Sequence, residues 1–164
     1  MNTFLHPGEI YVCGEPALVT TILGSCISVT LFAARLRVGG ICHARLPHGR
    51  GPNPLDYVDT AILCMVKILD RMGVRRDETE VKLFGGADVL NQVSGSGKSI
   101  GRQNIETAVE VIEDLGLQLS DHAVGGNAGR KLHFQTSTGT VTWTYVGVEA
   151  ANHRNTTTYE RQSI

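Results

Sequence analysis

The residues best suited to chemistry in this chain are Cys26 and His43. Cys26 follows the pair Gly24-Ser25, which is typical of a tight turn. A thiolate is the nucleophile that acyl-transfer reactions need, and a neighbouring histidine is the usual group that generates one. If the chain folds back between these two residues, it brings a thiol and a base together.

The segment between the two residues predicts such a hairpin. Residues 27–32 alternate apolar and small polar side chains, which indicates a β-strand. We centre the following turn between Ala34 and Arg35, which places Cys26 directly opposite His43. Opposed residues in an antiparallel pair have Cβ atoms about 4.5–5.5 Å apart. The turn has no Gly, Asn, Asp or Pro, so its chemistry does not fix the register, and a slip of one residue would separate the pair onto opposite faces.

This pairing divides the two strands into an apolar face and a more polar face. The apolar face is expected to form core and carries Ile27, Val29, Leu31, Val38 and Cys42. The polar face carries Cys26, Ser28, Thr30, Ile41 and His43. Cys42 should therefore point away from its neighbour His43, and we interpret Cys13, Cys42 and Cys64 as small buried hydrophobic residues.

The remaining pattern predicts one α+β domain. Apolar residues at helical spacing indicate a helix that begins at Asn53-Pro54 and ends at Gly73. A second helix should run from about Arg102 to Leu115. About eight strands, mostly antiparallel, complete the pattern, so we expect mostly antiparallel sheets with two main helices packed on the outside. The other expected strands are 9–12, 17–21, 81–84, 117–124, 132–136 and 141–146.

Composition narrows the class of protein. The net charge of -1 over 164 residues argues against a surface built to bind polyanions. The longest apolar run is too short to span a membrane, and residues 1–7 do not form a signal peptide. Four irregularly spaced cysteines are typical of reduced thiols in the cytoplasm. The polar tail, residues 149–164, is expected to be mobile and to lie outside the domain formed by residues 1–148.

Metal and nucleotide sites are poorly supported. The sequence has no Cys-x-x-Cys or His-x-x-x-His pair, so no metal site is expected. Residues 95–99 resemble part of a phosphate-binding loop, but Gln92 stands where the first glycine of that motif belongs. We predict a surface loop there and no cofactor.

Five motifs together resemble the CheD family of chemoreceptor glutamine deamidases. They are Val-Thr-Thr-Ile-Leu-Gly-Ser-Cys at 19–26, Gly-Gly-Ile-Cys-His-Ala-Arg-Leu-Pro at 39–47, Phe-Gly-Gly-Ala at 84–87, Ile-Gly-Arg-Gln-Asn at 100–104 and Gly-Gly-Asn-Ala-Gly-Arg at 125–130. Each motif is weak alone, but their order is specific and spans roughly residues 8–146. The pair Ala44-Arg45 is more polar than the bulky pair usual in the family.

The resemblance implies a catalytic role for three side chains. Cys26 would be the nucleophile, His43 its partner, and Thr20, six residues before the cysteine, would complete the site by orienting His43. Thr21 is the nearest competitor for that last role, but on an alternating strand it faces the opposite side from Thr20. The resemblance also implies a β-sandwich core with flanking helices, similar to the deamidating bacterial toxins.

We therefore expect a cytoplasmic protein-glutamine deamidase that works through a thioester. Backbone N–H groups around Gly24 and Ser25 would stabilise the oxyanion. By resemblance, the substrates are glutamines on the cytoplasmic helices of chemoreceptors, and a CheC-type phosphatase is a further partner. Loops 47–54, 88–101 and 125–130 would flank the substrate.

Two alternatives remain open. The chain could be a non-catalytic binding module that regulates receptors or a CheC-type phosphatase, although such an adaptor would not need Cys26, His43 and Thr20 together. It could also be a thiol hydrolase that acts on another acyl group, because a Cys–His pair alone does not define the substrate.

Overall fold

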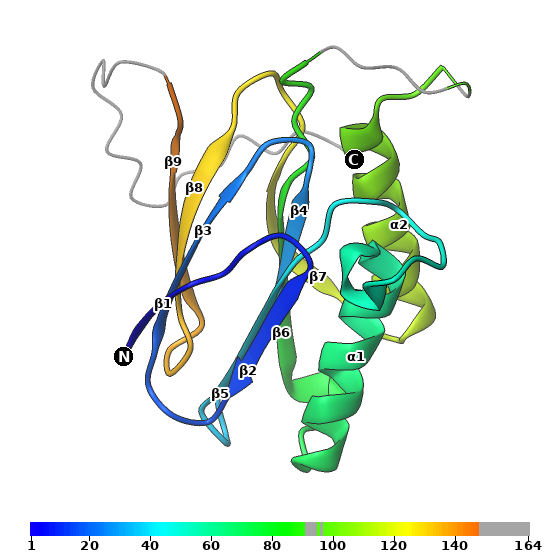
Figure 1. The fold of residues 1–164 in the computed structure, drawn as a ribbon. Coiled ribbons are helices and arrows are strands. Elements are labelled where there is room, and N and C mark those ends of the chain that lie inside the picture. Colours follow the sequence, from blue (N-terminus) through cyan, green and yellow to red (C-terminus); the bar gives the residue numbers. More distant parts are fainter. Residues whose placement is uncertain (91–94, 96, 148–164) are drawn as a thin grey trace.

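The computed structural model describes residues 1–90, 95 and 97–147, which form three layers. A four-stranded sheet packs on a five-stranded sheet, and two helices cover the outer face of the five-stranded sheet (Figure 1). The strand orders are β1-β3-β8-β9 and β2-β5-β4-β6-β7. Among the described strands, β1–β3 and β6–β7 pair in parallel and the other pairs are antiparallel. The expected α+β fold with outer helices is confirmed.

The bounds of the elements follow the hydrophobic pattern closely. The elements are β1 (Asn2–Phe4), β2 (Glu9–Cys13), β3 (Leu18–Leu23), β4 (Ile27–Ala33), β5 (Val38–His43), η1 (Pro54–Asp56), α1 (Val58–Arg71), η2 (Arg76–Glu78), β6 (Thr79–Gly85), α2 (Ile100–Asp114), β7 (Leu119–Val124), β8 (Arg130–Gln135) and β9 (Thr140–Tyr145). Strand β1 was not predicted, because three residues are too few to show alternation. The predicted tail, residues 149–164, lies outside the described residues.

The predicted start of the first helix needs a correction. The Asn53 side chain does accept a hydrogen bond from the Leu55 N–H, as an N-cap does, but the turn that it caps is a separate 3₁₀ turn, η1. Helix α1 begins only at Val58. No helix among the described residues is long and apolar enough to cross a membrane.

The β4–β5 hairpin has a different register from the predicted one. Its last ladder pair is Ala33–Val38, which leaves a four-residue turn closed by a hydrogen bond from the Arg37 N–H to the Ala34 carbonyl at 3.2 Å. Arg37 has a φ of 52°, a left-handed conformation that side chains other than Gly, Asn and Asp seldom adopt. The sequence carries none of those residues here, so it could not show where the turn closes.

The shift changes the partner of Cys26. Ile27 pairs with Ala44, so Cys26 lies opposite Arg45 and diagonal to His43, where we had predicted direct opposition. Diagonal neighbours have Cβ atoms about 7–8 Å apart, a gap that a thiol and an imidazole side chain can bridge together. A shift of two residues preserves which side chains share a face, so Cys26 and His43 remain on the same side.

Both predicted faces of the hairpin are buried. The apolar face packs on the helices in a core that includes Ile27, Val29, Leu31, Val38, Cys42, Ile62, Met65, Ile105 and Ile112. The other face packs on the four-stranded sheet through two smaller clusters, one around Val19, Ile41 and Phe134 and one around Leu23, Phe84 and Leu132. The candidate site therefore lies at the contact between the two sheets.

Candidate active site

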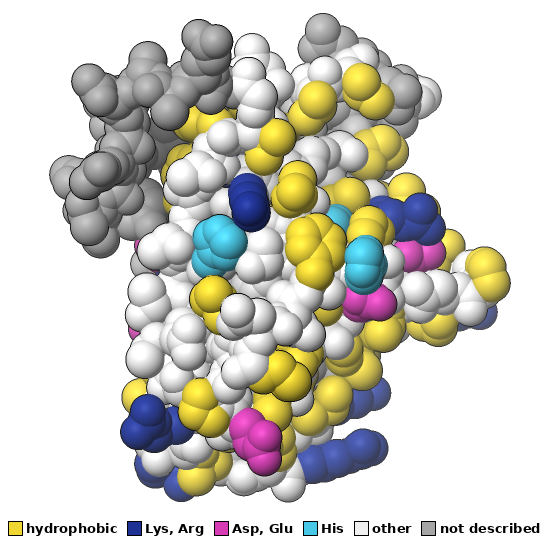
Figure 2. All heavy atoms as spheres, turned by 60° about the vertical axis from the view of Figure 1, so that its left-hand side comes forward, with side chains coloured by type: hydrophobic (Ala, Val, Ile, Leu, Met, Phe, Trp, Pro, Cys, Tyr) yellow, Lys and Arg dark blue, Asp and Glu magenta, His cyan; other side chains and the backbone are white. Residues whose placement is uncertain are grey.

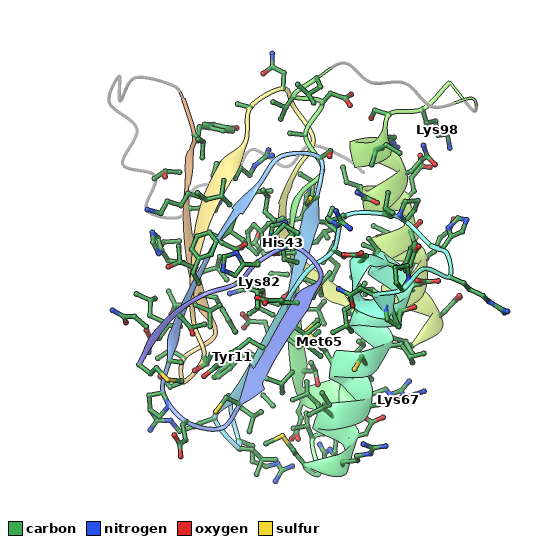
Figure 3. The ribbon with its side chains drawn as sticks, viewed as in Figure 1. Tyr11, His43, Met65, Lys67, Lys82 and Lys98 are labelled. Carbon is green, nitrogen blue, oxygen red and sulfur yellow. The ribbon has the colours of Figure 1, made fainter. Side chains whose placement is uncertain are left out.

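His43 is held between the sheets at the end of β5 (Figure 3). Its side chain is buried, with only 3% of the residue exposed. The Nδ1 atom lies 2.8 Å from the Thr21 hydroxyl oxygen of β3, and that hydroxyl donates to the Leu5 carbonyl oxygen at 2.8 Å. A chain of hydrogen bonds thus joins the imidazole to the N-terminal segment.

This chain of hydrogen bonds fixes the tautomer of the ring. A hydroxyl has one hydrogen, and the Thr21 hydroxyl gives it to the Leu5 carbonyl, which can only accept. The Thr21 oxygen must then accept the hydrogen bond that it shares with His43, so Nδ1 carries the ring proton. In the neutral ring the lone pair lies on Nε2, which is buried and has no hydrogen-bond partner among the described residues. Nε2 is therefore available as a base.

Burial keeps the His43 ring neutral. Loss of solvation lowers its pKa to about 4, and the Leu5 carbonyl opposes this shift only in part. At neutral pH the imidazole is uncharged, which is the state that a general base requires.

Thr20 does not make the contact that was predicted for it. Val19, Thr21 and Leu23 face the sheet–sheet contact and are fully buried, so Thr20 points to the opposite side of β3. Its hydroxyl lies 2.9 Å from Nδ1 of His133 on the neighbouring strand β8. The prediction that Thr20 orients His43 is therefore wrong, because a difference of one residue along a strand reverses the face. Thr21 takes that position.

Cys26 lies in the turn between β3 and β4 and is partly buried against the cluster of Leu23, Phe84 and Leu132. Burial raises the pKa of its thiol, while the positive charge of Arg45 and the N–H of Cys26 itself act in the opposite direction. Together with the lowered pKa of His43, this favours a resting pair of neutral thiol and neutral imidazole.

Arg45 carries the positive charge that lowers the pKa of the Cys26 thiol. Its guanidinium holds Asp56 through two parallel hydrogen bonds, from Nε at 3.0 Å and from NH2 at 2.7 Å. The paired geometry fixes the guanidinium although half of the side chain is exposed. The positive charge of Arg45 thus lowers the pKa of the Cys26 thiol, and the negative charge of its partner Asp56 acts in the opposite direction.

The turn that carries Cys26 is fastened to the end of β6. The Gly24 carbonyl accepts from the Ala87 N–H at 2.9 Å, and the Cys26 carbonyl accepts from the Gly86 N–H at 2.8 Å. A side chain at Gly85 would collide with the Cys26 carbonyl, so this approach requires glycine. Among the described residues, the N–H groups of Ser25 and Cys26 donate to no backbone carbonyl.

The described residues contain no group of three His, Cys, Asp or Glu side chains placed to hold a metal ion. The chemistry available at the site is that of a thiol, an imidazole and nearby N–H donors.

Comparison with known sequences identifies the family. Residues 44–145 match the family described as CheD chemotactic sensory transduction. The chain is 41% identical over 140 residues to a probable chemoreceptor glutamine deamidase CheD 2 of Geobacter sulfurreducens, covering 85% of this chain and 87% of that protein. It is 44% identical over 151 residues to a probable chemoreceptor glutamine deamidase CheD of Maridesulfovibrio salexigens, covering 85% and 89%. A third relative, of the same name and from Thermococcus kodakarensis, is 36% identical over 140 residues, covering 82% and 86%.

The chain belongs to the CheD family. The matched family segment begins directly after His43, whereas the aligned relatives extend over most of the chain. Family membership therefore rests on alignments that cover 82% to 85% of the chain.

The CheD motifs converge around Cys26 in space. The Gly125 N–H donates to the Gly85 carbonyl at 2.9 Å, and the Asp88 N–H donates to the Gly126 carbonyl at 2.8 Å. These two bonds place the loop after β7 against the loop after β6, which itself holds the cysteine turn. Motifs that are far apart in the sequence thus form one end of the molecule.

Sequence reasoning missed two contributors to the site. The Leu5 carbonyl could not be found, because backbone groups carry no sequence signal. Asn104 was quoted only as part of a motif, yet it is completely buried on α2. The available signal was a polar residue of low helix propensity beside the inward-facing Ile105.

Proposed function

We propose that this CheD-family chain is a protein-glutamine deamidase that acts on chemoreceptors. The relatives carry that activity in their names. The observation that supports it most directly is the state of His43, whose Nδ1 is bound by Thr21 while Nε2 is free on the face shared with Cys26. That arrangement places an uncharged base on the same face of the hairpin as the thiol.

The reaction proceeds in two halves. Nε2 of His43 takes the thiol proton of Cys26 as the sulfur attacks the side-chain amide carbon of glutamine. The tetrahedral intermediate collapses when the same proton passes to the departing nitrogen, which leaves as ammonia, and a γ-glutamyl thioester remains. Water then gives a proton to Nε2, attacks the thioester carbon and releases glutamate, and the proton returns to the sulfur.

Charge develops on two groups, and each has a stabiliser. The oxyanion would be met by N–H groups of the turn, those of Ser25 and Cys26, which have no carbonyl acceptor in the described structure. The transient imidazolium is supported by the Thr21 oxygen and the Leu5 carbonyl, which lie at the Nδ1 side. Gly24 contributes to the turn through its carbonyl, which accepts from the Ala87 N–H.

The surface around the turn suits a protein substrate. Exposed apolar side chains lie close to it: Ile22 on the outer side of β3, Leu46 after Arg45, and Val89, which lies beside Gly24. Figure 2 shows hydrophobic side chains in the upper middle of the face that it views, with a basic side chain and histidines among them. Such a surface fits the apolar side of a receptor helix in the cytoplasm, and a CheC-type phosphatase sharing it would inhibit competitively.

The test is mass spectrometry of a folded receptor fragment incubated with the protein. We expect a mass gain of roughly one dalton per converted glutamine, since deamidation replaces NH2 by OH, and rate accelerations of at least about 10⁶-fold. Cys26→Ala should abolish the gain. Cys42→Ala should keep it, because Cys42 is buried in the helix-facing core.

Two results would contradict the proposal. Conversion by Cys26→Ala at the wild-type rate would remove the thiol mechanism. Binding of the receptor without any conversion by the wild-type protein would favour the non-catalytic module. Free glutamine should be a negligible substrate, because it brings no binding surface to hold its amide within about 3–3.5 Å of the sulfur.

A further inference from the structure

Asn104 occupies an unusual position beside the cysteine turn. It lies in the first turns of α2, is fully buried, and donates through Nδ2 to two backbone carbonyls. These are the Ser25 carbonyl at 2.9 Å and the Arg45 carbonyl at 3.0 Å. Ser25 precedes Cys26, and Arg45 lies opposite Cys26 across the hairpin. A single side-chain amide thus connects the segment just before β4 with the segment just after β5.

The two hydrogen bonds determine which end of the Asn104 amide faces the turn. Carbonyl oxygens only accept, so both contacts require the NH2 group of the amide to face them. The other end, Oδ1, is buried and accepts no hydrogen bond among the described residues. A buried acceptor without a partner costs free energy and calls for an explanation. The double donation at the other end of the same side chain offers one.

The bond to Ser25 has a consequence for Cys26. The Ser25 carbonyl and the Cys26 N–H belong to one planar trans peptide unit, so they point in opposite directions. Holding the carbonyl toward α2 therefore directs the Cys26 N–H away from α2. That N–H also favours the thiolate of Cys26, which indicates that it faces the sulfur side of the residue.

Close backbone packing brings Asn104 to this place. A side chain at Gly101 would collide with the Gly86 carbonyl, and one at Gly86 would come within 2.5 Å of an Ile105 carbon. Because both positions are glycine, the start of α2 approaches the end of β6, which holds the cysteine turn. The distance from helix to turn is then short enough for one asparagine.

We propose that Asn104 is a positioning residue that orients the Ser25–Cys26 peptide so that its N–H meets the oxyanion of the deamidation reaction. The inference rests on the proposed function. It assigns to Asn104 no contact with substrate, and its effect passes through the backbone of the turn.

The main experiment compares Asn104→Ala with Ile112→Ala. Ile112 is buried on the same helix about two turns further on, and its truncation should lower the melting temperature without touching the turn. For Asn104→Ala we expect kcat to fall by about 10²-fold, the range for loss of one oxyanion donor, with KM changed little. Ile112→Ala should keep kcat within about twofold at a temperature where both variants are folded.

A second variant covers the case in which Asn104→Ala does not fold. Asn104→Asp keeps the shape of the side chain, and burial should favour its protonated form, which donates one hydrogen bond. As pH rises, the ionised carboxylate would face two carbonyl oxygens as an acceptor. The kcat of Asn104→Asp should therefore fall with increasing pH over a range where the wild-type kcat is constant.

A third measurement needs no substrate and separates the two proposals. The pH dependence of iodoacetamide alkylation at Cys26 reports the thiol pKa, which should rise in Asn104→Ala and not in Ile112→Ala. If the wild type converts no receptor glutamine but this rise occurs, the proposed function fails and the positioning role stands. If kcat and the alkylation profile of folded Asn104→Ala match the wild type, or if Ile112→Ala loses as much kcat, the positioning role is overturned.

Discussion

At the scale of single residues, the site depends on which of two adjacent threonines reaches the histidine. Thr21 contacts Nδ1 of His43 from the inner face of β3, and Thr20 contacts His133 on the outer face. The two side chains have the same chemistry and lie one position apart, so their difference is entirely one of strand parity. This makes them natural controls for each other.

We predict that Thr21→Val lowers kcat by about 10²-fold, the cost of a misplaced catalytic group. Valine keeps the β-branched shape but removes the oxygen that accepts from Nδ1, so the tautomer with a free Nε2 is no longer favoured. Thr20→Val should change kcat by less than about threefold, and Thr21→Ser should stay near the wild type. Steady-state ammonia release measures all three. Equal losses in the two valine variants would show that the contact with His43 does not decide the rate.

The neutral resting pair predicts a distinctive pH profile. Burial lowers the pKa of His43 to about 4 and raises the pKa of the Cys26 thiol from its ordinary value. Between these limits the base stays deprotonated and the thiol stays protonated, so kcat/KM should be flat from about pH 6 to 8.5. Alkylation of Cys26 should accelerate only at a higher pH than alkylation of a free cysteine, with Cys26→Ala as the blank.

A different pH dependence would contradict the neutral resting pair of Cys26 and His43. A plateau of alkylation between pH 6 and 8, or an acidic limb of kcat/KM near pH 6.5, would indicate a thiolate–imidazolium pair in the resting protein. The neutral pair would then be wrong.

At the scale of elements, the site is assembled by contacts between backbones. The cysteine turn, the end of β6 and the start of α2 approach one another through Gly85, Gly86 and Gly101. Arg130 has a similar role in the loop after β7, where it donates to the Gly125 carbonyl at 2.9 Å and lies 5.4 Å from the ring centres of Trp143 and Tyr145. These contacts give Arg130 a structural role in holding the loop.

We predict that Gly101→Ala destabilises the protein although it lies in a helix. Helix propensity alone would make alanine more stable by about 1 kcal/mol. The new methyl group would collide with the Gly86 carbonyl, so we expect a net loss of about 1–3 kcal/mol, as in overpacked cores. Chemical denaturation measures the change. Gly14→Ala is the control, because a Cβ there would make only ordinary contacts with the side chains of Val38 and Met72. A stabilised Gly101→Ala protein would refute the close approach.

At the scale of the whole molecule, burying His43 between two sheets couples its titration to the stability of the fold. The pKa of His43 is 6.5 in a model compound and about 4 in the folded protein. Between about pH 6.5 and 4, the imidazole of His43 is therefore protonated in the unfolded chain and mainly neutral in the folded chain. The free energy of unfolding falls as pH decreases from about 6.5 to 4, and above 6.5 this group contributes no slope.

We predict that the free energy of unfolding falls by about 3 kcal/mol across this pH range, because folding lowers the pKa of His43 from 6.5 to about 4. Urea denaturation at pH 7, 5.5 and 4.5 would measure it. His43→Gln, which cannot titrate, should lose most of the slope. Glu78, whose pKa is lowered to about 2 by Arg35, acts mainly below pH 4.5 and so does not confuse the comparison. Identical slopes in wild type and His43→Gln would contradict the burial argument.

Much of the site follows from the sequence alone. The alternation in 27–32 and the residues up to His43 determine which side chains share a face, so Cys26 and His43 could be placed together, and Cys42 apart from them, without a structure. The helix pattern around Ile105 and Ile112 determines which side of α2 is buried. These features depend on local periodicity, which follows directly from the order of the residues.

Only the tertiary structure decided the register, the orienting group and the support of the turn. The β4–β5 turn closes at Arg37 in a left-handed conformation that no sequence signal marks, which moves Arg45 opposite Cys26. Thr21 and the Leu5 carbonyl meet His43 because two sheets pack face to face. Asn104 meets Ser25 because two glycines let a helix approach. Such contacts join segments far apart in the chain, so their distances are set by packing and cannot be read from spacing along the sequence.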